Sequence, residues 1–100
     1  KATILEQSYS ELEGLGQLLL ENPTIHIRIE GHTDNIGKAE DLIQLSLDRA
    51  NAVKDFLVQK GINPLRIETI GQGPKSPIND NSSDELRQLN RRVEVVIVRF

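Results

Sequence analysis

The segment TIHIRIEG, residues 24–31, alternates strictly between apolar and polar side chains. The apolar members are Ile25, Ile27 and Ile29, and the polar members between them are His26, Arg28 and Glu30. Successive side chains of a strand point to opposite faces, so this pattern predicts a strand with one buried face. Such a face needs a covering layer, which here must come from helices.

Helical spacing appears on both sides of this strand. Residues 5–21 carry leucines at positions 5, 12, 15, 18 and 19, and the Asn22-Pro23 pair ends the predicted helix. Residues 38–61 give the strongest helical pattern, and Gly61 is a suitable C-terminal stop. Its apolar stripe consists of Leu42, Leu45, Ala50, Val53, Phe56 and Leu57.

The second half of the chain predicts two more strands and a short helix. A strand is expected over residues 66–70, and a polar loop with two prolines follows over residues 74–83. Residues 83–90 form one or two helical turns capped by Ser83 or Asp84. The closing run, residues 91–100, is apolar enough to predict a strand in a well-buried position of the sheet.

These elements predict a two-layer α/β (α+β) sandwich, with a mixed sheet and two long helices on one of its faces. The strand–helix–strand crossover makes the first two strands parallel neighbours. The central strands should be Thr24–Glu30 and Val93–Arg99. One hundred residues suffice for one core, so residues 1–100 are expected to form a single domain.

Composition excludes several classes of function. The formal net charge of −3 argues against a protein that binds nucleic acid through its phosphates. The chain has no cysteine, which removes disulfides and zinc–thiolate sites. Its apolar runs, such as LLL at residues 18–20 and VVIV at residues 95–98, are far too short to span a membrane. Any membrane attachment is therefore expected from parts of the protein outside this chain.

The stretch GHTDNIG, residues 31–37, places Asp34 just beyond the carboxyl end of a predicted strand. Ligands of α/β sheets bind at that end of the strands, which makes Asp34 a candidate binding residue. The alternative interpretation is an ordinary loop aspartate that caps the next helix or makes a turn hydrogen bond.

Arg49 is the sharper signal, because Arg49 and Ser46 interrupt the apolar stripe of the second helix. A guanidinium beside a core-facing stripe needs an acid or a bound anion. It could instead extend past Leu45 and Val53 to water, or pair internally with Asp34 or Asp48. If Asp34 and Arg49 border one pocket, their opposite charges suit a zwitterionic ligand such as an amino-acid head group.

Other chemistries have weaker support in the sequence. His26, Glu30 and His32 share strand parity, but Arg28 lies among them, so a solvated strand face is expected and no metal site. Ser46 and Ser76 lie in no nucleophile pattern, and no cofactor motif is present. The Arg91-Arg92 pair is a small basic cluster that either forms a surface patch or braces a neighbouring loop.

Four blocks in order carry a family resemblance: IEGHTDNIG, LSLDRANAVKDFLVQKGI, RIETIGQGPKSPINDN and LNRRVEVVI. They resemble the OmpA-like C-terminal domain, which also occurs in peptidoglycan-associated lipoproteins and flagellar stator proteins. The resemblance covers residues 25–97 and implies an OmpA-like βαβαβ topology. Family members usually open with a strand, so the first strand of this chain is expected to be missing or truncated. The chain is expected to be a fragment of a longer outer-membrane protein or lipoprotein.

The resemblance implies a binding module that is not an enzyme. Its partner would be peptidoglycan, held non-covalently through the diaminopimelate residue of the stem peptide by Asp34 and Arg49. Such a module would anchor the outer membrane to the cell wall from the periplasmic face of a Gram-negative envelope. The further expected pocket residues are Thr33, Leu42, Leu45 and Arg92. The family usually has asparagine where this chain has Leu42, which removes one polar group from the pocket.

Two other functions remain open at this point. One is a protein-docking domain that kept the fold and lost the wall ligand, which Leu42 favours. The other is a metal-dependent hydrolase built from His26, His32 and Asp34.

Overall fold

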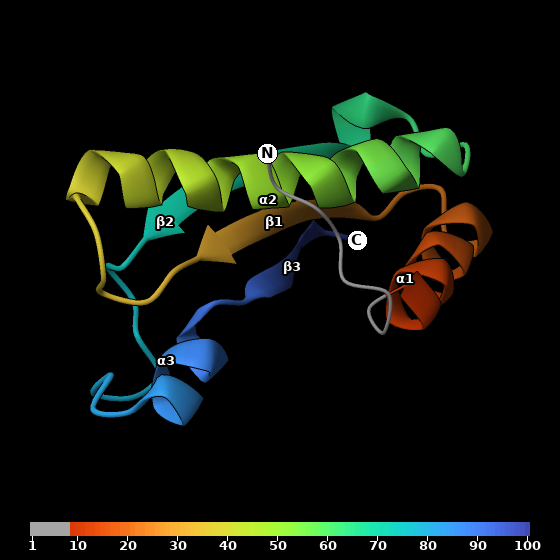
Figure 1. Cartoon of the computed structure of the whole chain (residues 1–100). Coiled ribbons are helices and arrows are strands. Elements are labelled where there is room, and N and C mark those ends of the chain that lie inside the picture. The colour runs from red at the N-terminus through yellow and green to blue at the C-terminus, as the bar shows by residue number, and fades with distance from the viewer. Residues whose placement is uncertain (1–8) are drawn as a thin grey trace.

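The computed structural model describes residues 9–100 of the chain. The elements in order are α1 (Tyr9–Glu21), β1 (His26–His32), α2 (Ala39–Gln59), the 3₁₀ turn η2 (Pro64–Arg66), β2 (Ile67–Gly73), α3 (Asp84–Asn90) and β3 (Val93–Arg99) (Figure 1). The predicted helical turn around Leu5, and the predicted truncation of a first strand, fall outside the described residues.

The sheet has three strands in the order β2-β1-β3. β1 pairs parallel with β2 and antiparallel with β3, so the predicted mixed sheet and the parallel crossover are confirmed. β1 is central as predicted, and Ile27 and Ile29 on its inner face are fully buried. It continues two residues beyond the predicted Glu30, because His32 still exchanges backbone hydrogen bonds with Arg92.

The prediction that β3 is a central, well-buried strand is wrong for the part of the chain that the structure describes. β3 lies at the edge of the three-stranded sheet, and five of its seven residues are exposed while the other two are only partly buried. Val95 and Ile97 point to the helix-facing side, opposite Ile29 and Ile27, yet both are substantially exposed. An apolar run indicates side chains that gain by burial, but it does not say whether anything covers them.

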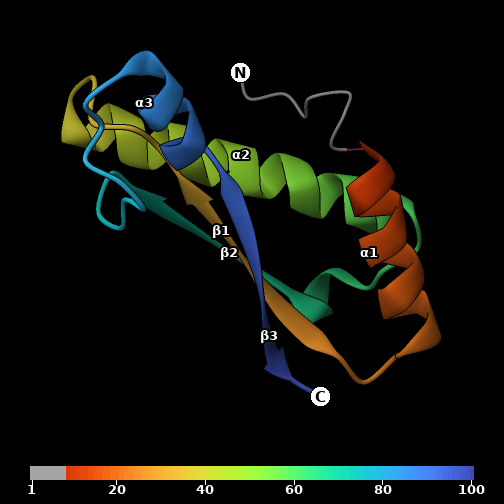
Figure 2. The same cartoon turned by 90° about the horizontal axis from the view of Figure 1, so that it is seen from below.

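One layer of helices covers the inner face of the sheet, which confirms the predicted two-layer sandwich. α2 runs along the face over β1 and β2, and α1 crosses the far end of α2 (Figures 1 and 2). The buried apolar core joins both helices to the sheet and consists of Leu19, Ile25, Ile27, Ile29, Ala50, Val53, Leu57, Ile62 and Ile67. No helix among residues 9–100 has the length and hydropathy needed to cross a membrane.

The closest approach between α2 and the sheet depends on glycine. Gly31 of β1 pairs with Gly71 of β2, and a Cβ built on Gly31 would lie 1.9 Å from the backbone oxygen of Ser46. A Cβ on Gly71 would lie 2.6 Å from the backbone oxygen of Ile43. These distances exclude any side chain, so α2 rests directly on the strand backbones at this point.

Ser46 fixes the same contact with hydrogen bonds. Its hydroxyl donates to the backbone oxygen of Ile43 and accepts from the backbone N–H of Gly73 at 2.9 Å. Ser46 therefore interrupts the apolar stripe because it joins α2 to β2, which is a structural role.

The chain between β2 and β3 forms a separate small layer at the carboxyl end of β1. In Figure 1, α3 lies below the strands while α2 lies above them. Ser83 caps α3 as predicted, since its hydroxyl accepts from the N–H of Leu86 at 3.2 Å. Asn90 is completely buried and clips the preceding loop to α3, with hydrogen bonds to Ile78, Asn79 and Asn81.

The glycine contact gives a direct test of this packing. Gly31→Ala should destabilise the domain by at least about 3 kcal/mol, because the added methyl overlaps a helix backbone that cannot move alone. Gly14→Ala is the matched control: no atom lies within 4 Å of its added Cβ, and the position is inside α1. It should be neutral or stabilise by about 0.5–1 kcal/mol. Urea unfolding would measure both; equal stability of the two variants would contradict the described packing.

Candidate functional site

Asp34 lies in the loop between β1 and α2 and is almost fully buried, with 6% of its surface exposed. One carboxylate oxygen accepts the backbone N–H of Ile36 at 3.0 Å, and the other accepts Nη1 of Arg91 at 2.5 Å. The predicted turn hydrogen bond is thus present. The helix-capping alternative is wrong, because the N-cap residue of α2 is Lys38 and no side chain caps this helix.

The surroundings of Asp34 favour its charged form. Burial alone would raise the pKa of Asp34, but the hydrogen bonds from Ile36 and Arg91 and the charges of Arg91 and Arg87 outweigh it and lower the pKa below its usual value. Asp34 is therefore a carboxylate at neutral pH. Each of its two carboxylate oxygens is held by one hydrogen bond, from Ile36 or from Arg91.

Arg49 lies on α2 one turn after the buried Ser46, and its side chain is partly buried. Its Nη1 is buried and has no hydrogen-bond partner among the described residues. Neither Asp34 nor Asp48 forms an ion pair with it in this part of the chain, so the predicted internal pair is not found. A buried guanidinium nitrogen without an acceptor costs on the order of 1–3 kcal/mol, which an incoming carboxylate would relieve.

The two candidate residues lie on either side of the glycine contact. Gly31 touches Ser46, Asp34 follows Gly31 by three residues, and Arg49 follows Ser46 by three. α2 runs antiparallel to β1, since it connects β1 to the parallel strand β2. Helical side chains lean toward the N-terminus of their helix, which for Arg49 is the direction of the Asp34 loop.

The other predicted pocket residues have distinct surroundings. Thr33 is buried, its backbone N–H donates to Gly73, and its hydroxyl bonds the backbone oxygen of Asp34. Leu42 is buried and packs beside Gly37 in the loop that carries Asp34. Leu45 is partly buried on α2. Thr33 therefore shapes the loop, while Leu42 gives it an apolar support.

Arg91 is the residue that sequence reasoning missed in this site. The Arg91-Arg92 cluster had two interpretations, a surface patch or a brace for a loop, and the structure gives the brace. Arg91 holds Asp34, whereas Arg92 donates to Glu94 at 2.6 Å and to the backbone oxygen of Ser76 at 2.9 Å. The sequence offered no means of choosing which of two adjacent arginines meets Asp34.

The hydrolase constellation is not assembled. His26 lies at the opposite end of β1 from Asp34, is not buried, and contacts Arg99. His32 is not on a solvated face either: only 2% of its surface is exposed, and it faces Glu30 and Glu94. Glu94 could not be found by spacing, because it reaches this face through the cross-strand pairing of Glu30 with Glu94.

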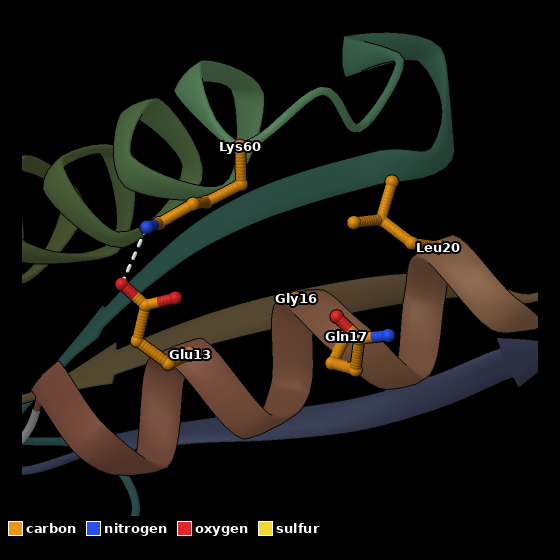
Figure 3. A pocket seen from close by; sticks show the side chains of 5 residues that line it. All are labelled: Glu13, Gly16, Gln17, Leu20 and Lys60. Carbon is orange, nitrogen blue, oxygen red and sulfur yellow. Dashed lines mark ion pairs between the residues drawn. The ribbon is translucent and has the colours of Figure 1, made fainter.

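A small pocket lies elsewhere, between α1 and α2, and is not part of this site. Figure 3 shows its lining residues Glu13, Gly16, Gln17, Leu20 and Lys60. An ion pair between Glu13 and Lys60 bridges it, and its volume of 70 Å³ leaves room for little more than water. It lies at the C-terminal end of α2, about 30 Å along the helix from the Asp34 end.

Comparison with known proteins assigns the chain to a family. The model of the OmpA family matches residues 1–91. The chain belongs to the OmpA family.

Similar proteins agree with this assignment. The chain is 37% identical over 98 residues to outer membrane porin F of Pseudomonas aeruginosa, covering 97% of this chain and 28% of the porin. It is 38% identical over 96 residues to the peptidoglycan-binding protein ArfA of Mycobacterium tuberculosis, covering 96% of this chain and 29% of ArfA. The chain thus spans less than a third of these relatives.

The crystal structure of the peptidoglycan-associated lipoprotein from Burkholderia pseudomallei has the same fold. It superposes with a TM-score of 0.92 at 28% identity, and the match covers 95% of this chain and 80% of the lipoprotein. The predicted family and the OmpA-like fold are confirmed. Asp34 therefore lies just beyond the carboxyl end of the central strand of an OmpA-family domain, and Arg49 lies on the helix that packs over that strand.

The pair of Asp34 with Arg91 predicts a specific pH dependence. Asp34→Asn keeps an oxygen for Ile36 but removes the charge that Arg91 meets, so it should cost about 1 kcal/mol at neutral pH, because Arg91 is partly exposed and screened. The pKa of Asp34 is lowered by folding, so this contribution is present above the unfolded pKa of about 3.9 and is lost as the pH falls through the folded value.

Urea unfolding at neutral pH and near pH 3 would measure the effect. The stability difference between the parent and Asp34→Asn should shrink at the lower pH. Asp55→Asn, which changes an exposed acid on α2, is the control and should have little effect at either pH. A difference that stays constant with pH would show that Arg91 does not stabilise the charged form of Asp34.

Proposed function

We propose that this domain binds peptidoglycan non-covalently, with the diaminopimelate residue of the stem peptide held between Asp34 and Arg49. The observation that carries the proposal is that Nη1 of Arg49, on α2, is buried without a hydrogen-bond partner among the described residues. A carboxylate accepts two parallel hydrogen bonds from a guanidinium, which matches the carboxylate of a zwitterionic head group.

The matching ammonium of the ligand would meet Asp34. This carboxylate is buried, charged and preorganised by Ile36 and Arg91. The ligand then places one positive and one negative group against two groups of opposite charge. A neutral or singly charged side chain would leave one protein charge desolvated without a partner.

Relatives of this chain support the same ligand class. ArfA is named a peptidoglycan-binding protein, and the matching Burkholderia protein is named a peptidoglycan-associated lipoprotein. The porin relative is an outer membrane protein. By this likeness, the domain works in the periplasm as a tether between the outer membrane and the wall, within a longer protein whose other parts supply the membrane attachment.

Attachment of this kind depends on many weak contacts. A few charge-assisted hydrogen bonds contribute roughly 1.5–3 kcal/mol each before the costs of ordering the ligand are subtracted. One domain would therefore hold one stem peptide loosely. Many copies facing a polymeric wall would make the attachment durable through effective concentration.

Substitution of Arg49 is the main test. Arg49→Ala should abolish retention on purified sacculi and leave the thermal midpoint close to that of the parent, since Nη1 of Arg49 loses no hydrogen-bond partner among residues 9–100. Arg49→Lys should also bind poorly, because an ammonium cannot make the two parallel bonds. Asp34→Ala should abolish retention too, at a cost of about 1 kcal/mol in stability.

Arg99→Ala is the matched control. It removes an arginine from the opposite end of the sheet, where Arg99 contacts His26, and it should bind sacculi like the parent. If Arg49→Ala melts far below the parent, Arg49 is a structural brace. If Arg49→Ala and Asp34→Ala both fold and still bind, the wall site lies elsewhere on the domain. If the parent folds but does not bind, a protein-docking function, which Leu42 in place of the family's asparagine favours, becomes the better account.

Selectivity between peptidoglycan types tests the ligand itself. Sacculi with diaminopimelate should be retained better than sacculi with lysine at the same place, because lysine lacks the carboxylate that Arg49 would bind. The difference should be roughly 1–3 kcal/mol, or about 5- to 150-fold in affinity. Competition with soluble stem peptides of the two kinds would measure it, and equal affinities would contradict the proposed geometry.

A further inference from the structure

The geometry points to a second site: we propose that His32, Glu30 and Glu94 bind one divalent transition-metal ion of the zinc class. This cluster lies across the β1–β3 pair on the sheet surface opposite α2, and it is separate from the Asp34 and Arg49 site. It does not depend on the proposed wall binding.

The first observation is the state of the His32 side chain. The side chain is 3% exposed, and neither of its ring nitrogens has a hydrogen-bond partner among the described residues. Buried polar groups in folded proteins nearly always have partners, so an orphaned imidazole calls for a ligand. In contrast, the backbone N–H and the carbonyl oxygen of His32 both form hydrogen bonds with the backbone of Arg92.

The second observation is where Nε2 of His32 points. It lies 3.9 Å from Oε1 of Glu30 and 3.7 Å from Oε1 of Glu94. Both distances are too long for hydrogen bonds. All three potential ligand atoms lie within 4.8 Å of one another. They therefore surround a common point without bonding one another.

The remaining carboxylate oxygens are occupied, which fixes the orientation of both acids. Oε2 of Glu30 accepts Nε of Arg28 at 2.8 Å, and Oε2 of Glu94 accepts Nε of Arg92 at 2.6 Å. Each arginine thus holds a carboxylate from outside and leaves its Oε1 turned toward His32. Hydrogen bonds of this kind orient the ligands in many metal sites.

The distances suit a small ion. Zinc binds nitrogen and oxygen at about 2.0–2.2 Å, which places neighbouring ligands of a tetrahedron about 3.4 Å apart. The separations from Nε2 of His32 to the two carboxylate oxygens exceed this by only a few tenths of an ångström, and the two carboxylate oxygens lie within 4.8 Å of each other. Side-chain rotation would close that difference. One imidazole with two carboxylates leaves a fourth position for water.

The charges are also compatible. The negative charges of Glu30 and Glu94 are balanced by the positive charges of Arg28 and Arg92, which hold them. A metal ion would add positive charge to a cluster that is already neutral, so we expect its affinity to be moderate. Burial and Arg92 lower the pKa of His32, against the opposite effects of Glu94 and Glu30. The imidazole is therefore neutral at neutral pH, which is the form that binds metals.

Calorimetric titration of the chelator-stripped 100-residue chain with Zn²⁺ tests the site, with Mg²⁺ as the oxygen-preferring comparison. The parent should bind one Zn²⁺ per chain, bind Mg²⁺ more weakly, and gain thermal stability with Zn²⁺. Glu94→Gln and Glu30→Gln should each weaken Zn²⁺ binding at least about 10-fold while keeping the side-chain shape. His32→Gln should abolish it.

Two controls distinguish this site from surface binding. His26→Gln removes the other histidine, and Glu68→Gln removes an acid from the same surface of the sheet. Both should bind Zn²⁺ like the parent. If His32→Gln fails to fold, the two glutamate variants still decide the question. Binding that survives Glu94→Gln and Glu30→Gln, or that disappears with His26→Gln, would overturn the proposal, as would a parent that binds no Zn²⁺.

Discussion

The contact of α2 with bare strand backbone is the constraint on which the rest of the structure depends. Gly31 and Gly71 are paired neighbours, and the helix backbone around Ile43 and Ser46 occupies the space where their side chains would be. This contact sets the height and the register of α2 over β1. It therefore also sets where Arg49 stands relative to the loop that carries Asp34, although neither residue takes part in the contact.

A second constraint acts from the other side of the sheet, through residues 90–94. Asn90 is buried and ties the preceding loop to α3, and β3 begins at Val93, after Arg91 and Arg92. Arg91 then holds Asp34, and Arg92 holds Glu94 beside His32. One short segment thus holds one acidic side chain in each of the two proposed sites. Its backbone is locked to β1 by the paired hydrogen bonds between His32 and Arg92.

The sequence predicted those features that depend on local pattern. Alternation identified β1, the helical stripe identified α2, and Ser83 marked the start of α3, because each signal lies within one element. The same reasoning singled out Arg49, since a charge in an apolar stripe is visible along one helix. It failed for Arg91, the partner of Asp34, and for Glu94. Arg91 lies between α3 and β3 and Glu94 lies in β3, far along the chain from their partners, and contacts between distant segments leave no trace in residue spacing. It also failed for the exposure of β3, because a strand pattern does not reveal its neighbours.

The two charges of the proposed wall site differ in their unbound state, and this asymmetry decides which of them drives binding. Asp34 already accepts hydrogen bonds from Ile36 and Arg91. A ligand ammonium must share or replace the contact with Arg91, so only the difference in free energy between the two contacts favours binding. Nη1 of Arg49 is buried and has no acceptor among the described residues. A ligand carboxylate would therefore displace no existing hydrogen bond, and nearly the whole free energy of the new one would favour binding. In this arrangement the carboxylate supplies affinity, whereas Asp34 supplies selectivity by excluding ligands that bring a second anion. Because Arg91 competes for Asp34, the proposed contact with one stem peptide would be weak and reversible, as suits the proposed tether that acts through many copies.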